Sequence, residues 1–167
     1  DEEVIARCPW ATTGRTHHRT PNIITSLELD PAEMEKRNIH LQKKYAEIEE
    51  NEVRFEELHC EDAEYLIVAF GSCARIAQKA MEMAREEGIK VGLLRPITLW
   101  PFPSKAIAAR AAQVKGILTV ELNAGQMVED VRLAVECKVP VEHFGRLGGI
   151  VPDPDEVITA LKEKLIK

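Results

Sequence analysis

One stretch near the middle of the chain limits the possible folds more than any other, because its pattern predicts strand, turn, helix and strand in succession. Residues 65–70 form a continuous apolar run, which is typical of a parallel strand covered on both faces. Gly71-Ser72 ends this run, and apolar residues then recur at helical spacing over 73–87. Gly88 is well placed to end that helix in a left-handed conformation, and a second strand follows at 91–95. This order predicts a right-handed βαβ unit.

The rest of the chain continues the alternation of strands and helices. Further strands are predicted at 53–58, 116–120 and 139–144. Further helices are predicted from about residue 31 to 50, after the caps Ser104 and Asp153, and after Gly125. The alternation predicts an α/β fold, a three-layer α/β/α sandwich with a mostly parallel five-stranded sheet. The turn before residue 65 is too short for a helical crossover, so we expect the first strand to be an antiparallel edge strand.

The N-terminal part predicts a separate organisation. Residues 1–29 lack sustained periodicity, and we interpret them as an extended arm or interdomain linker. The sequence Asp30-Pro31-Ala32-Glu33 predicts a helix start, with Asp30 as the N-cap and Pro31 in the first turn. The Glu33 side chain is expected to reach back to the N-cap. That helix is heavily charged with a thin apolar stripe, so we expect 30–52 to be a linker helix that lies against a partner. Residues 53–167 then form the α/β domain.

Composition excludes several classes of partner. The net charge of −6 and the pI near 5.5 argue against a nucleic-acid partner, and no apolar run approaches the ~20 residues of a membrane span. The four cysteines, at positions 8, 60, 73 and 137, contain no Cys-x-x-Cys pair and predict neither a cluster nor a zinc site. Cys73 and Cys137 fall on apolar helical positions, and reduced cysteines favour a cytoplasmic location. Since Asp1 is not an initiator methionine, we expect a processed chain or a fragment.

Several segments carry a family resemblance. They are Pro9–Gly14, Asn22–Leu27, Gly71–Arg75, Arg85–Gly92, Leu94–Pro103, Glu121–Asn123 with Gly125–Met127, and Gly145–Gly149. Together they resemble the alpha subunit of 2-oxoacid:ferredoxin oxidoreductases of the 2-oxoisovalerate or 2-oxoglutarate type, in the domain homologous to the transketolase C-terminal domain. The resemblance implies the mixed five-stranded sheet that the spacing also predicts.

The resemblance also implies a function for the whole enzyme. Such an enzyme oxidatively decarboxylates a 2-oxoacid to an acyl-CoA and reduces ferredoxin, using thiamine diphosphate, magnesium, coenzyme A and iron–sulfur clusters. Neither cofactor-binding domain of the family nor any cluster cysteine motif is recognisable in this chain. We therefore expect a non-catalytic structural and assembly domain that binds no cofactor alone. Its expected partners are the other domains and subunits of the oxidoreductase.

The glycine turn after the first buried strand is the candidate for ligand binding. Gly71, Ser72 and Arg75 stand at a helix N-terminus, where backbone N–H groups favour an anion. In the alternative interpretation, Gly71 only makes a tight turn and Ser72 caps the helix. An anion or nucleotide at this turn would indicate a different function, that of a free-standing flavodoxin-like binding module. The turn lacks the glycine and lysine patterns of dinucleotide and ATP sites.

Residues on other turns are candidates for subunit contacts. Trp100 and Phe102, held by prolines, either anchor an interface or cover the open end of the core. Glu121, at the end of a buried strand, either has a functional role or accepts N–H groups from the turn 123–126. The full set of interface candidates is Trp100, Phe102, Glu121, Asn123, Gln126 and Arg146. The His17-His18 and His59-Cys60 pairs lack the spacing for three convergent metal ligands, so neither a metal site nor a catalytic residue is predicted.

Overall fold

The computed structural model of the chain describes residue 23 and residues 25–166. Most of the expected arm, residues 1–29, therefore lies outside the described residues. The chain divides into two compact units, 1–42 and 43–167. The division falls inside helix α2 (Pro31–Asn51). The boundaries expected from the sequence, with an arm at 1–29, a linker helix at 30–52 and a domain at 53–167, stay a prediction.

Helix α2 begins where its capping sequence predicts. One Asp30 carboxylate oxygen accepts hydrogen bonds from the backbone N–H groups of Ala32 (2.8 Å) and Glu33 (3.1 Å). Pro31 occupies the first helical position, where its missing N–H costs no hydrogen bond. None of the helix's residues is buried, so α2 is a solvated helix, as its thin apolar stripe predicts.

The second unit contains the predicted mixed sheet. Its strands are β1 (Phe55–Leu58), β2 (Tyr65–Ala69), β3 (Val91–Pro96), β4 (Gly116–Glu121) and β5 (Val141–Gly145). They lie in the order β1-β3-β2-β4-β5. Strand β1 pairs antiparallel with β3, and every other pair is parallel. The antiparallel edge strand is thus confirmed, and the βαβ unit β2-α3-β3 joins neighbouring strands.

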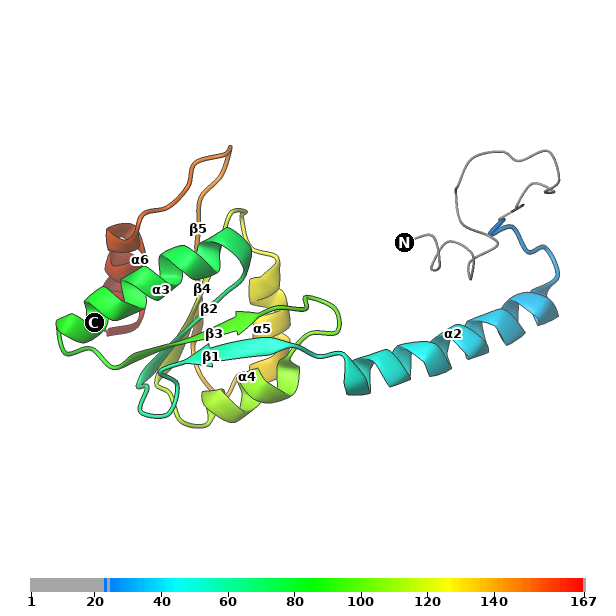
Figure 1. The fold of residues 1–167 in the computed structure, drawn as a ribbon, viewed down its shortest axis with the longest axis horizontal. Coiled ribbons are helices and arrows are strands. Elements are labelled where there is room, and N and C mark those ends of the chain that lie inside the picture. Colours follow the sequence, from blue (N-terminus) through cyan, green and yellow to red (C-terminus); the bar gives the residue numbers. More distant parts are fainter. Residues whose placement is uncertain (1–22, 24, 167) are drawn as a thin grey trace, which may run out of the picture. The chain divides into compact units, whose positions relative to one another are not determined.

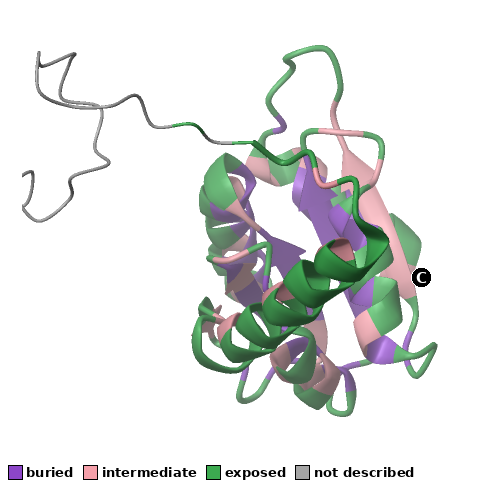
Figure 2. Cartoon of the chain, turned by 90° about the vertical axis from the view of Figure 1, so that its right-hand side faces the viewer, coloured by how far each residue is buried: buried purple, intermediate pink, exposed green. Residues whose placement is uncertain are grey.

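Helices cover both faces of the sheet and complete the three layers (Figure 1). One face carries α3 (Gly71–Glu86), α6 (Pro154–Leu161) and the π-helical turn η1 (Lys162–Ile166). The other face carries α4 (Ser104–Ala111) and α5 (Met127–Val135). Alternate residues of the central strands supply the two cores, for example Ile67 to the α3 side and Leu66 to the α4 side. Buried residues concentrate in the sheet and on the inward helix faces (Figure 2).

Two further helix ends follow their sequence signals. Gly88 adopts a φ of +85°, and the N–H of Ile89 donates to the carbonyl of Ala84 at 3.0 Å, which closes α3 as expected. Asp153 and Glu156 form a complete capping box at the start of α6.

Two predicted caps and one cysteine assignment were wrong. Phe70 is the N-cap of α3, with no side-chain hydrogen bond, so Ser72 lies inside the helix. Pro103 precedes α4, so Ser104 is its first residue. Helix α5 ends at Val135, and Cys137 lies beyond it, exposed and left-handed with a φ of 60°. Cys73 is buried in α3, as predicted.

An ion pair ties the edge strand to the helical layer. The guanidinium of Arg110 on α4 donates to the carboxylate of Glu57 on β1, with the Nε atom 2.9 Å away, and also to the backbone carbonyl of Cys60. Both side chains are about four-fifths shielded from solvent. The hydrogen bond from Arg110 holds the pKa of the Glu57 carboxyl below its ordinary value.

We expect the amide hydrogens of α2 to exchange at least roughly tenfold faster than those of β2, because local opening is easier where few apolar contacts resist it. No residue of α2 is buried, whereas Leu66 to Ala69 are all buried between two neighbouring strands. Hydrogen–deuterium exchange on the chain measures both segments in one experiment. Equal protection would show that α2 belongs to a stable core.

We expect Glu57→Gln to lower the free energy of unfolding at neutral pH. We also expect that free energy to decrease less steeply in acid than it does in the unmodified protein. The pKa of Glu57 is lower in the folded protein than its ordinary value. Its contribution to the free energy of unfolding is therefore fully present above the unfolded-state pKa of about 4.3. That contribution is lost as the pH falls through the lower folded-state pKa. Urea unfolding at several acidic pH values measures this slope. Glu61→Gln, an exposed control on the next turn, should leave the slope unchanged; identical profiles for the two variants would contradict the assignment.

Candidate functional site

The carboxyl ends of β2, β3, β4 and β5 meet along one side of the sheet, which we call the carboxyl edge. The chain leaves β2 toward β3 on one side and leaves β4 toward β5 on the other. This reversal, between the ends of β2 and β4, is where open α/β sheets usually bind ligands. The carboxyl edge is therefore the candidate functional site of this domain.

Glu121 closes the end of β4 and is the buried carboxylate of this edge, with an exposed fraction of 1%. Its Oε1 accepts hydrogen bonds from the backbone N–H groups of Gln126 (3.2 Å) and Met127 (2.8 Å), and its Oε2 accepts from Val128 (3.1 Å). The negative charge thus faces the positive end of the α5 dipole. Of the turn expected to donate to Glu121, only Gln126 does so; the other donors belong to α5.

A histidine from the neighbouring strand joins this carboxylate. His143 on β5 places Nδ1 3.3 Å from Glu121 Oε2 and 3.2 Å from Thr119 Oγ1. Its Nε2 lies 3.3 Å from the backbone carbonyl oxygen of Asn123. Thr119, which is fully buried, also donates to the backbone of β5 at Glu142. Sequence reasoning missed this cluster, because its members come from two strands and a turn that are distant in sequence.

Gly145 allows the turn after β4 to approach β5. A side-chain Cβ at this position would collide with the Asn123 carbonyl oxygen and lie 2.6 Å from His143 Nε2. The N–H of Arg146, the next residue, donates to the backbone carbonyl of Glu121 at 3.2 Å. Only glycine, which has no Cβ, fits at the last position of β5.

The structure brings four of the sequence-predicted interface candidates to this edge. Asn123 is half-buried, and its Oδ1 accepts from the Gly125 N–H at 2.7 Å. Gln126 is exposed at the N-cap of α5. Arg146 is half-buried and pairs with Glu156 of α6 at 3.0 Å. Glu121, by contrast, is enclosed, so it meets the domain's own backbone.

The glycine turn after β2 lies at the same edge, because β2 is the strand next to β4. Gly71 has a φ of +56°, and Gly71, Ser72 and Arg75 are all exposed. No side-chain hydrogen bond caps the N-terminus of α3, which begins here. Anion binding at these residues stays a prediction.

The two aromatic residues of the proline loop have different surroundings. Phe102 is half-buried and packs against the core on the α4 side. Trp100 is 54% exposed, and its ring meets that of Tyr45 edge to face, with centroids 5.5 Å apart. Phe102 thus covers the core, as one interpretation of this loop expects. Trp100 is largely open, which leaves it available as the interface anchor of the other interpretation.

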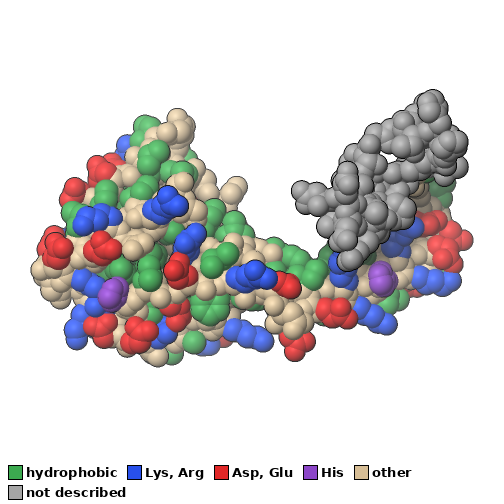
Figure 3. Space-filling view, viewed as in Figure 1, with side chains coloured by type: hydrophobic (Ala, Val, Ile, Leu, Met, Phe, Trp, Pro, Cys, Tyr) green, Lys and Arg blue, Asp and Glu red, His purple; other side chains and the backbone are tan. Residues whose placement is uncertain are grey.

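Large apolar side chains are exposed on the loops that follow three of the parallel strands. They are Ile97 and Leu99 after β3, Leu122 after β4, and Leu147, Ile150 and Val151 after β5, each 46–62% exposed. We call them the carboxyl-edge surface. Figure 3 shows hydrophobic side chains reaching the surface around the loop after β3, between charges of both signs. Apolar residues in predicted loops are the sequence signal that points to this surface.

The two histidine-containing pairs named in the sequence differ in how far the structure describes them. Cys60 is buried, which raises the pKa of its thiol to about 11, while His17 and His18 lie outside the described residues. Within residue 23 and residues 25–166, no three His, Cys, Asp or Glu side chains are grouped for metal binding. Over the same residues, no helix combines the length and apolarity needed to cross a membrane.

Known proteins resemble this chain over most of its length. The pyruvate:ferredoxin oxidoreductase core domain II family matches residues 63–157. Ketoisovalerate oxidoreductase subunit VorB of Methanothermobacter thermautotrophicus is 46% identical over 165 residues, 97% of this chain and 46% of the relative. 2-Oxoglutarate synthase subunit KorA of Archaeoglobus fulgidus is 32% identical over 143 residues, 84% of this chain and 40% of the relative. The chain thus spans less than half the length of these relatives.

Two solved structures share the fold. The 2-oxoglutarate:ferredoxin oxidoreductase from Magnetococcus marinus, with 2-oxoglutarate, coenzyme A and succinyl-CoA bound, matches with a TM-score of 0.69 and 26% identity, over 81% of this chain and 24% of that one. A split gene transketolase in an inactive tetrameric form matches with a TM-score of 0.57 and 20% identity, over 68% of this chain and 42% of that one. The transketolase match bears on the fold alone, and the predicted fold class is confirmed.

We expect Glu121→Gln to destabilise the domain by about 1–3 kcal/mol, because a charged acceptor of buried N–H groups is replaced by a neutral amide that carries donors of its own. Urea unfolding near neutral pH measures the loss. Glu142→Gln removes the same charge from a half-buried position on β5, where the Thr119 hydroxyl donates to the backbone carbonyl and no hydrogen bond to the carboxylate is found among the described residues. A loss for Glu121→Gln no larger than that for Glu142→Gln would contradict the capping role.

Proposed function

Because this chain belongs to the pyruvate:ferredoxin oxidoreductase core domain II family, we propose that it is a structural and assembly domain of a 2-oxoacid:ferredoxin oxidoreductase. In this proposal it forms part of the alpha subunit of a thiamine diphosphate-dependent, cytoplasmic enzyme of anaerobic metabolism. The enzyme converts a 2-oxoacid oxidatively to an acyl-CoA and passes electrons to ferredoxin. The similarity to VorB over 97% of this chain supports the placement.

The observation that carries the assembly role is the carboxyl-edge surface. Three loops at one side of the sheet each expose large apolar side chains, from Ile97 after β3 to Val151 after β5. Exposed apolar residues gathered on one side of a domain are typical of a contact with another protein surface. Open α/β sheets use this side for their ligands, and here we propose that it meets another domain or subunit.

The polar cluster behind this surface supports a structural role. A carboxylate that activates a cofactor must reach the cofactor with a free oxygen, but both oxygens of Glu121 accept hydrogen bonds from backbone N–H groups of α5. His143 fills the remaining side of the carboxylate. These residues therefore do not fit the thiamine diphosphate of the proposed enzyme. We place that cofactor, with magnesium, coenzyme A and the iron–sulfur clusters, on other domains and subunits.

The alternative function has no specific observation in its favour. A free-standing flavodoxin-like module would use the Gly71–Arg75 turn, where Gly71, Ser72 and Arg75 are exposed and no side chain caps the helix. The length of the relatives also supports a domain within a longer subunit, because VorB extends well beyond the matched region.

We expect the double variant Leu122→Ser and Leu147→Ser to weaken assembly with the partner subunits at least roughly tenfold, because truncating a central apolar anchor commonly costs ~2 kcal/mol of binding. Its melting temperature should change little, since both side chains are about half exposed. Co-expression of the full subunit with its partners, followed by size-exclusion chromatography, measures assembly. Leu133→Ser, on α5 and 77% exposed, is the control away from this edge.

The two measurements separate the possible outcomes of that experiment. A lower melting temperature with normal assembly would show that the carboxyl-edge surface belongs to the domain's own fold. Equal loss of assembly in the Leu133→Ser control would show that replacing any exposed leucine weakens assembly, wherever it lies on the domain. Either result contradicts the proposed function.

A further inference from the structure

A groove lies between the last turns of α2 and the proline loop before α4. It has a volume of about 940 Å³ and lies wholly within the second compact unit. Its apolar lining includes Val53, Phe55, Trp100 and Phe102. This volume is near the upper end of the ~300–1,000 Å³ typical of ligand clefts, so the groove has room for several side chains of a bound segment.

The apolar lining offers anchors that are open to a partner. Trp100 is 54% exposed and Phe55 is 40% exposed, and Pro101 and Pro103 hold the loop between them with little conformational freedom. Aromatic and proline surfaces of this kind bind peptide segments rich in apolar side chains. Strand β1 begins at Phe55 and is the outer strand of the sheet, so among the described strands only β3 pairs with it.

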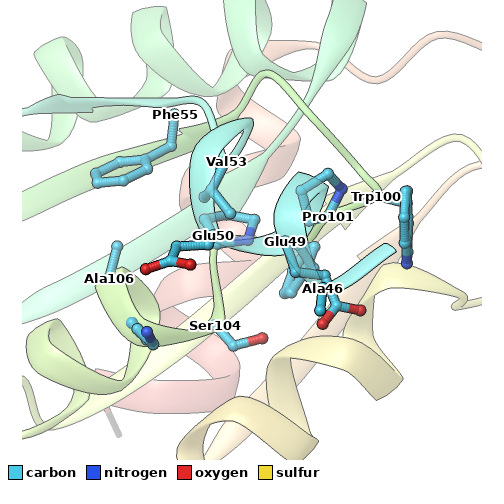
Figure 4. Close-up of a pocket in the computed structure, with 12 residues that line it drawn as sticks. Ala46, Glu49, Glu50, Val53, Phe55, Trp100, Pro101, Ser104 and Ala106 are labelled. Carbon is cyan, nitrogen blue, oxygen red and sulfur yellow. The ribbon is translucent and has the colours of Figure 1, made fainter. Parts of the chain in front are cut away.

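The groove carries more negative than positive charge. Glu49 and Glu50 line it from α2 (Figure 4), and neither forms an ion pair within the described part of the chain. The carboxylate of Glu50 extends toward Ala106, and that of Glu49 lies on the side of Trp100 (Figure 4). The last turn of α2 carries no basic residue, so the negative end of the helix dipole adds to both carboxylates. Lys105 also lines the groove and offsets one of these charges.

From this charge and lining, we propose that the groove binds a segment of a partner protein in which apolar side chains stand beside lysine or arginine. The apolar side chains occupy the floor against Trp100 and Phe55, and the cations meet Glu49 and Glu50. A small-molecule ligand fits less well, because such sites orient their ligand with buried polar groups, whereas both glutamates are exposed. The groove shares the loop after β3 with the carboxyl-edge surface but is lined by other side chains of that loop. This inference does not depend on the assembly role proposed above.

Three short peptides test the proposal on the full 167-residue chain: alternating leucine and lysine, alternating leucine and glutamate, and alternating serine and lysine. We expect the leucine–lysine peptide to bind with a dissociation constant on the order of 1 mM or tighter and to shift the indole N–H signal of Trp100 in NMR spectra. The other two peptides should bind at least roughly tenfold more weakly, because each lacks one of the two features that the groove recognises. The remaining tryptophan, Trp10, is removed as Trp10→Phe to assign the signal.

Matched variants locate the binding. The pair Glu49→Gln and Glu50→Gln should weaken the leucine–lysine peptide roughly fivefold, whereas Glu47→Gln with Glu52→Gln, at the same helix end but outside the groove lining, should change it less than about twofold. Trp100→Ala should abolish binding measured by calorimetry, and Leu133→Ala should not. Absent binding, equal affinity for the three peptides, or equal effects of the two glutamate pairs would overturn the proposal.

Discussion

The carboxyl side of this domain depends on one interaction, the capping of α5 by the Glu121 carboxylate. A strand that ends in a carboxylate and a helix that begins with unsatisfied N–H groups satisfy each other directly, which fixes the turn between them. His143 extends this junction to β5, and Gly145 permits the close approach that His143 and Asn123 require. The positions of the loops after β4 and β5 follow from that arrangement. Removing the carboxylate would therefore loosen two loops at once.

Because Glu121 is engaged in this junction, its carboxylate is not available to a ligand at the carboxyl edge. Most α/β domains keep polar groups free at the switch point for a ligand, but here Glu121 is used internally and the outward side chains, such as Leu122 and Leu147, are apolar. The edge is thus suited to a protein surface, and the groove beside Trp100 is suited to a charged segment. In the two proposals made above, these two faces with different chemistry meet two different neighbours of the domain.

Local sequence signals predicted most of the fold, and non-local contacts account for what they missed. The apolar run of β2, Gly88 at the end of α3 and the capping box at Asp153 all act within a few residues, so their patterns can be recognised in the chain. Ser72 and Cys137 were misassigned by one helical turn or less, because neighbouring residues compete for helix ends. The pairing of Glu121 with His143 joins residues that only the strand order brings together. Likewise, the segment Leu94–Pro103 carried the family resemblance, but only the structure separated half-buried Phe102 from exposed Trp100.

The central claim is that the carboxyl edge of this domain is a protein contact within the assembled oxidoreductase. Hydrogen–deuterium exchange compared between the full subunit alone and the assembled enzyme tests it most directly. We expect the loops 97–100, 122–126 and 146–151 to gain protection on assembly, because partner contact removes them from solvent, and we expect the exposed turn 71–75 to remain unchanged. Unchanged exchange in those three loops, with new protection at 71–75 instead, would contradict the account.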